Sequence, residues 1–488
     1  MIKSFGFRIY IVALILRLIP ILLSRGLGIG LDDMFQYDML ARSLAAGNGF
    51  RWYAQQDLNL LAPYVNFDLS TVKSYDPVHG VPTSFRAPLY PSFLALIYFL
   101  VGSNSSRFFA ARLAQAAILG APLAPLTYWV SKMLFSPSLS VEEPGERSER
   151  AAKFSAWVIA CYPLFLVYPL GLGTENPFFV LLLASFLFLL QSIQQPSTSR
   201  LLLSSFFLGL TVLTRSVILP FAIAAFGLLL FLHRKRVLLA ILSFFLIIIP
   251  WIIRNSMLHR KLIGIETSMG YNLYLGYHPQ GNGSFVFGPS LDLLSILDDA
   301  ERDRIGTEKA VGFIKDQPER CIPLAINRLG FFFGLEKRVL MYFYSNNLIG
   351  YVPLPLLLTI SAILLLPFIV ISISAALGLV FLRSIPQHIL LILLLIAYIL
   401  PHVLILSEDR FHLALVPYLT ILAAQVWVHG LTPLEQRWHE SQMGKIIVMV
   451  AIFCAFLLVI NWGSELTREA DKILQILGPN GNQTYFPY

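Results

Sequence analysis

Two adjacent carboxylates, Asp32 and Asp33, follow the first apolar run of the chain, which ends near Leu23. A carboxylate placed where a chain leaves a bilayer is costly, and it can take a proton from a hydroxyl group. A short amphipathic helix follows, with its apolar stripe at Tyr37, Leu40, Ala41 and Leu44. Aspartate also caps helices well. The two residues alone therefore leave a catalytic base and a helix cap as equal interpretations.

Other charged residues stand at the ends of apolar runs far along the chain. They are Arg86, Glu175, Arg215 and Arg410, with Glu408, Asp409 and His412 beside the last of them. Arginine binds phosphate bidentately, and a nearby carboxylate can act as a general base. Each arginine alone also fits head-group anchoring, and Glu175 alone fits an ion pair with Arg215 or Arg17. Taken together, the set suits a substrate that combines lipid, phosphate and sugar.

The composition defines the class of protein that must position these residues. The 488 residues are 56% hydrophobic and 13% charged, and the formal net charge is +8. Repeated apolar runs of about 20 residues are typical of a polytopic helical membrane protein. Lys and Arg cluster in short loops, as in the cytoplasmic loops of membrane proteins, so the charge does not indicate nucleic-acid binding. The three cysteines form no CxxC motif and predict no disulfide or metal framework.

The apolar runs predict about eleven membrane spans. They lie at 7–23, 108–134, 154–172, 177–191, 201–214, 216–232, 237–253, 353–382, 387–406, 413–430 and 446–462. Arg17 falls inside the first span, and we expect it to extend outward to the interface. The run 88–101 is too short to cross comfortably and predicts an interfacial helix. If it crossed, the basic run Arg234–Arg236 would lie outside, against the positive-inside rule.

The sequence thus predicts an all-α polytopic membrane protein with a transmembrane domain over 1–462 and an extracytoplasmic tail over 463–488. A large first extracytoplasmic loop, 24–107, carries interfacial helices at 33–46 and 88–101. A second extracytoplasmic segment covers 254–352. On this topology the candidate charged residues all lie at the outer membrane face.

Six short motifs, spread from residue 7 to about 425, resemble the GT-C glycosyltransferases, and most closely the branch of protein O-mannosyltransferases and aminoarabinose transferases. The motifs are Asp33 and Tyr37 followed by MLARSLAAGNGF, Arg86–Pro91 (RAPLYP), Thr174–Pro177 (TENP), Leu213–Arg215 (LTR), Trp251–Asn255 (WIIRN), and Arg410–His412 (RFH) before Pro417. The segment between Phe50 and Arg86 is longer than in the aminoarabinose enzymes, and TENP has one residue more than the usual pattern. Both departures leave the acceptor class open.

The resemblance implies roles for individual residues. Asp33 corresponds to the catalytic base, with Asp32 as the second choice, and Glu175 to a second catalytic acid. Arg86 and Arg215 correspond to ligands of the donor phosphate. We expect Tyr37, Arg410 and His412 to contribute to substrate binding. A divalent metal, used by the oligosaccharyltransferase branch, is not favoured because neither acidic segment holds a DxD or DxE motif.

The sequence therefore predicts a membrane glycosyltransferase that moves a sugar from a polyprenyl-phosphate donor to an extracytoplasmic acceptor hydroxyl, with inversion. The acceptor is a glycan, a lipid or a protein. The site faces the extracytoplasmic side, of the plasma (inner) membrane if the source is prokaryotic. The alternative is a transporter or flippase for an anionic lipid or solute, which would need charges along a mid-membrane path. A non-catalytic scaffold is a third interpretation.

Overall fold

The computed structural model describes residues 4–72, 74–135 and 144–486, and nearly all of its regular structure is helical. Within these residues the only sheet is one antiparallel pair of two-residue strands, β1 (Arg51–Trp52) and β2 (Val81–Pro82). The helices form a bundle in which α9 packs on α10 and α17 on both α19 and α21. The structure confirms the predicted all-α polytopic membrane fold.

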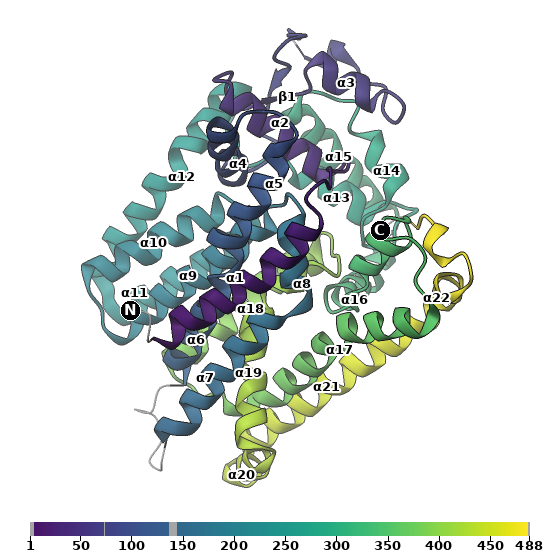
Figure 1. The fold of residues 1–488 in the computed structure, drawn as a ribbon. Helices are drawn as coiled ribbons and strands as arrows, with labels where there is room; N and C mark the ends of the chain where they lie inside the picture. Colours follow the sequence, from purple (N-terminus) through teal and green to yellow (C-terminus); the bar gives the residue numbers. More distant parts are fainter. Residues whose placement is uncertain (1–3, 73, 136–143, 487–488) are drawn as a thin grey trace.

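Helices occupy each range that the sequence predicts to cross the membrane (Figure 1). They are α1 (Phe5–Leu23), α5 (Ser106–Ala114) with α6 (Leu123–Leu134), α7 (Pro144–Cys161), α9 (Glu175–Gln194), α10 (Thr198–Val212), α11 (Leu219–His233), α12 (Val237–His259), α17 (Leu354–Gly378), α18 (Pro386–Leu404), α19 (Val416–His429) and α21 (Gln442–Arg468). By length and composition, seven stretches among the described residues could cross a membrane, or eight if one bent pair counts as one. Because α10 and α19 are shorter and α11 and α12 fall in one stretch, the number eleven stays a prediction.

The bent pair joins α7 to α8 (Pro163–Val167) at an angle of 51°. Proline has no N–H group, so Pro163 leaves the carbonyl of Ile159 without its helical partner. Arg17 fills this gap, because its guanidinium donates to the carbonyls of Ile159 and Ala160, at 3.2 Å each. The expectation that Arg17 extends outward is therefore wrong: its side chain is fully buried against the break in α7.

The first loop contributes three helices, α2 (Asp33–Ala45), α3 (Gln55–Leu61) and α4 (Leu89–Val101). Figure 1 shows them together at the top of the molecule, beside α13 (Met269–Tyr277) and α15 (Asp299–Asp316), with α20 (Thr432–Glu440) at the opposite end. α2 is anchored by the buried carboxylate of Asp38, which accepts from Arg107 at 2.8 Å and from Tyr98 at 3.0 Å. These bonds fix the helix whose first residue is Asp33.

The second large segment, after α12, continues through α14 (Phe287–Asp292) and α16 (Cys321–Phe332). A further helix, α22 (Ala470–Leu477), follows α21 and returns the chain toward this segment. There Asn482 donates to Asn347 at 2.6 Å, and the amide of Tyr485 donates to the carbonyl of Ser345. Segments distant in the sequence thus pack around the same end of the bundle as the first loop.

Candidate active site

The two adjacent aspartates have different environments. Asp32 is the N-cap of α2, and its side chain accepts from the amide of Met34 at 2.9 Å. Asp33 is the first helical residue, and its carboxylate pairs instead with Arg86 and, at 3.7 Å, with Arg410. Each of the two interpretations therefore applies to one residue. Asp32 is the helix cap, and Asp33 is the carboxylate that lies among arginines.

Arg86 lies in the first loop, three residues before α4. Its Nε donates to Oε1 of Gln36 at 2.9 Å, and its Nη2 donates to both Gln36 and Asp33. The guanidinium carbon is 5.2 Å from the centre of the Tyr37 ring, close enough for a cation–π contact. The hydroxyl of Tyr37 reaches the hydroxyl of Thr174 at 3.5 Å, which links α2 to the start of α9.

Glu175 and Arg215 form the second half of the cluster. Glu175 is the first residue of α9, and Arg215 ends the turn after α10. Their side chains meet at 3.0 Å, and the Glu175 side chain is only 9% exposed. A buried carboxylate needs such a partner because desolvation of an unpaired charge is expensive. This pairing is one of the two that the sequence suggested for Glu175, and the other, with Arg17, does not occur.

Arg410 joins the two halves. It lies 3.7 Å from Asp33, 3.6 Å from Glu175 and 2.9 Å from Glu408. Glu408 also accepts from Arg338 at 2.8 Å. The structure therefore brings together seven of the eight residues predicted for the site: Asp32, Asp33, Tyr37, Arg86, Glu175, Arg215 and Arg410.

His412, the eighth predicted residue, is not brought into this cluster. Its side chain is fully buried, with Nε2 3.0 Å from Oε1 of Glu336 and Nδ1 2.7 Å from the carbonyl of Phe332. Glu336 also accepts from Tyr162, and it lines a small cavity that Arg410 borders. His412 thus faces the interior behind Arg410, two residues along the same turn, and this arrangement favours support over substrate contact.

The two aspartates also differ in the direction in which nearby charges shift their pKa values. Partial burial disfavours the charge on Asp33, but Arg86 and Arg410 outweigh this effect and lower the pKa of Asp33 below its usual value. Asp32 is exposed, but partial desolvation by the surrounding chain and the neighbouring charge of Asp33 raise its pKa. Neighbouring carboxyl groups whose pKa values are pushed apart are typical of sites with divided roles.

A cavity of about 370 Å³, lined by both polar and apolar side chains, adjoins the cluster. Its wall includes Arg338, Glu408 and Asp409 from the neighbourhood of Arg410, together with Asn282, Ser284 and Lys337 from the second large segment. Amide, hydroxyl and charged groups offer both donors and acceptors of hydrogen bonds. Among the described residues, no group of three or more His, Cys, Asp and Glu side chains could hold a metal ion.

Sequence reasoning missed Arg338 and Gln36. Gln36 lies within the predicted helix, one turn after Asp33, so helical spacing could have placed it beside Arg86. Arg338 belongs to none of the motifs, and its approach to Glu408 depends on the path of a segment 70 residues away. No sequence signal marks it.

Comparison with known proteins adds an independent observation. Residues 145–253 match the family described as dolichyl-phosphate-mannose-protein mannosyltransferase, over less than half of the chain. Among solved structures, the chain is similar to ArnT from Cupriavidus metallidurans bound to undecaprenyl phosphate, at 12% identity and a TM-score of 0.38, over 88% of this chain and 79% of that one. A search of curated proteins finds no significant match. The match over residues 145–253 confirms the predicted resemblance and supports a multi-pass membrane glycosyltransferase.

Proposed function

We propose that this glycosyltransferase moves a sugar from a polyprenyl-phosphate donor to an acceptor hydroxyl at the extracytoplasmic face. The observation that carries the proposal is the cluster itself. Arg86, Arg215 and Arg410 converge at the ends of separate helices, and Asp33 lies among them. Three guanidinium groups supply the charge and the paired N–H donors that a phosphate group requires.

In the proposed reaction, Asp33 takes the proton of the acceptor hydroxyl, and the hydroxyl oxygen attacks the anomeric carbon. The bond between that carbon and the phosphate oxygen breaks, and polyprenyl phosphate leaves. Arg86 and Arg215 stabilise the negative charge that develops on the leaving phosphate. One displacement inverts the anomeric configuration, by analogy with inverting glycoside chemistry.

The acceptor approaches through this cavity beside Arg410. The cavity shares Glu408 with the salt-bridge network, which connects it through Arg410 to the proposed base, Asp33. Its amide, hydroxyl and charged groups can bind the hydroxyl groups of an acceptor, and Phe285, Phe331 and Met341 add apolar wall beside them.

The test compares wild type, Asp33→Asn and Asp32→Asn, purified in detergent, with a panel of polyprenyl-phosphate sugars. Release of polyprenyl phosphate is measured. Asp33→Asn should lower the rate by roughly 10²–10⁴-fold while the protein stays folded. Asp32→Asn is the matched control, because asparagine caps a helix about as well as aspartate. It should retain nearly full activity.

The reverse pattern, with Asp32→Asn inactive and Asp33→Asn active, would contradict the assignment of the base. If none of the three proteins turns over a donor, yet all bind an anionic lipid equally, the transferase proposal fails and the transporter alternative gains.

A further inference from the structure

Two residues just before Arg86 have a hydrogen-bond partner for every one of their polar groups. Thr83 and Ser84 follow β2 and are completely buried. The amide of Thr83 donates to the carbonyl of Phe50, and the carbonyl of Ser84 accepts from the amide of Thr267 at 3.0 Å. The hydroxyl of Ser84 lies 2.7 Å from Nε2 of His259. The backbone that leads into Arg86 therefore has little freedom.

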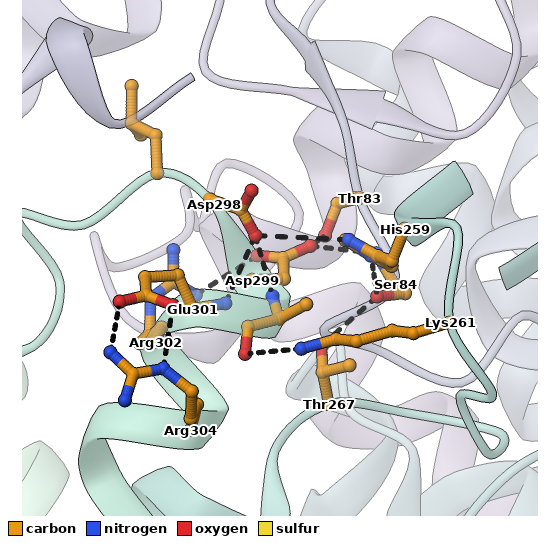
Figure 2. A network of polar contacts seen from close by, with 12 residues as sticks. Thr83, Ser84, His259, Lys261, Thr267, Asp298, Asp299, Glu301, Arg302 and Arg304 are labelled. Atoms are coloured by element: carbon orange, nitrogen blue, oxygen red, sulfur yellow. Dashed lines mark hydrogen bonds and ion pairs between the residues drawn. The ribbon is translucent and has the colours of Figure 1, made fainter. Parts of the chain in front are cut away.

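Asp299, more than 200 residues later, holds both residues at once. One oxygen of its carboxylate accepts from the hydroxyl of Thr83 at 2.5 Å and from the amide of Ser84 at 2.8 Å. Figure 2 shows Asp299 at the centre of this network, between Thr83 and Arg302. Arg302 pairs with Asp299 at 3.2 Å, and both side chains are fully buried.

The position of Asp299 is itself fixed by α15. Asp298 caps this helix and accepts from the amides of Ala300 and Glu301. Arg302, one turn later, donates to the carbonyl of Ile296 at 2.9 Å and lies 4.9 Å from the ring centre of Phe85, the neighbour of Arg86. The carboxylate thus stands on a rigid element, where its geometry is set by the second large segment and not by the first loop.

The chain is held on the other side of Arg86 as well. The amide of Leu89 donates to the carbonyl of Leu213 at 3.1 Å, two residues before Arg215. Arg86 therefore lies on a short segment between two fixed points, Ser84 and Leu89. A displacement of about 1 Å at a reacting centre can cost 10²-fold in rate, so such fixation matters for a phosphate ligand.

We propose that Asp299 is a positioning residue for Arg86, acting through Thr83 and Ser84 to aim the guanidinium at the donor phosphate. This inference rests on the proposed function of Arg86. It assigns the second large segment a part in donor recognition, although Asp299 itself makes no contact with the donor.

The test measures binding of farnesyl phosphate, a short polyprenyl phosphate, to the full-length protein in detergent. Arg86→Ala should weaken binding by about 10- to 100-fold, the range for hydrogen bonds to charged groups. Asp299→Asn and Thr83→Val should each weaken it by about 3- to 10-fold, the net contribution of one hydrogen bond lost when Arg86 is displaced from the phosphate. In an Arg86→Ala background neither change should weaken binding further, because residues that act as a unit are not additive.

Thr83→Val leaves the Asp299–Arg302 pair intact, so it tests the proposal even if Asp299→Asn does not fold. Thr83→Ser keeps the hydroxyl and should bind like wild type. Glu301→Gln is the matched control on α15, since Glu301 pairs with Arg304 at the surface, 2.5 Å away (Figure 2). It should leave binding unchanged.

Additive losses in the Arg86→Ala background would overturn the proposal, because they would show that Asp299 stabilises the fold without acting through Arg86. A wild-type protein that neither binds farnesyl phosphate nor turns over a donor would overturn the proposed function itself. Normal wild-type binding with unaffected Thr83→Val and Asp299→Asn would overturn the positioning role alone.

Discussion

Each of the three arginines that we assign to the donor phosphate already has a carboxylate partner. Arg86 pairs with Asp33, Arg215 with Glu175, and Arg410 with both of these acids and Glu408. An entering phosphate must replace carboxylates as the partner of the arginines. When it takes over Arg86, Asp33 loses a partner that stabilises its charge, and its basicity rises. Donor binding and activation of the base are therefore coupled at the level of single side chains.

This coupling predicts a pH dependence. The pKa of Asp33 is lowered in the free protein because Arg86 and Arg410 outweigh the effect of burial. The base works ionised, so kcat/KM should fall only below the ordinary aspartate pKa of about 3.9. In the donor complex the phosphate neutralises these arginines, so the acid limb of kcat should lie at higher pH. Profiles of the two parameters, measured on one donor, check this; coincident limbs would contradict it.

At the scale of elements, α1 depends on a break in a different helix. Pro163 frees the carbonyl of Ile159 in the α7–α8 bend, and Arg17 of α1 binds it together with the carbonyl of Ala160. Gly120 allows this packing, since a Cβ atom there would lie 2.9 Å from Cδ of Arg17. A cationic side chain inside an apolar helix is thus part of the joint between two helices.

Arg17→Met should therefore lower the free energy of unfolding by about 1–3 kcal/mol, the cost of leaving buried backbone acceptors unpaired. Arg8→Met removes an exposed arginine from the same helix and is the matched control. Unfolding of both variants in detergent, followed by heat or denaturant, gives the comparison. Equal stability of the two variants would show that the bonds from Arg17 do not stabilise the protein.

Local patterns in the sequence predicted where the helices lie better than they predicted which side chains contact one another. Hydropathy placed the helices, and α2 begins at Asp33, as its spacing suggested. The partners of Arg17 could not be predicted, because they lie 142 and 143 residues away and depend on the bend after α7.

For the candidate site, too, local features were predicted better than long-range contacts. The end-of-helix charges converge, since turns of a few residues at one membrane face leave them little choice of position. Burial of His412 behind Arg410 depends on how α16 and α17 pack around the turn, where Phe368 stacks on His412 at 3.8 Å. No periodic pattern in the sequence predicts this packing. Asp299 escaped notice for a similar reason, because its partners Thr83 and Ser84 are more than 200 residues away.

At the scale of the whole molecule, the cluster draws on chain positions 33, 86, 175, 215, 338 and 410. The two large segments, 24–107 and 254–352, contact each other next to the cluster through Asp299 and Arg254. Arg254 donates hydrogen bonds to the carbonyls of Thr83 and Phe50. We propose that this end of the bundle is extracytoplasmic, as the distribution of Lys and Arg indicates.

Single cysteines test this topology. In a chain with Cys161, Cys321 and Cys454 replaced by serine, Asn59→Cys should react with a membrane-impermeant maleimide added to intact cells. Ser199→Cys, in the first turn of α10, should react only after the membrane is permeabilised. Both native side chains are exposed, so accessibility in the protein does not limit either reaction. The inverse labelling pattern would place the cluster in the cytoplasm.

The bond between Arg17 and α7 also affects how the chain is made. α1 is synthesised before α7, and its acceptor at Ala160 is 143 residues further along. At about 5–20 residues per second, synthesis of that interval takes roughly 7–30 s. During this time the guanidinium has only the carbonyl of Ala13, in its own helix, as a partner among its hydrogen bonds in the structure. An arginine at the centre of a helix opposes insertion by about 2.5–3.5 kcal/mol. We therefore expect the first helix to complete its integration only when α7 arrives, with the insertion machinery holding an unfinished segment until its partner is translated.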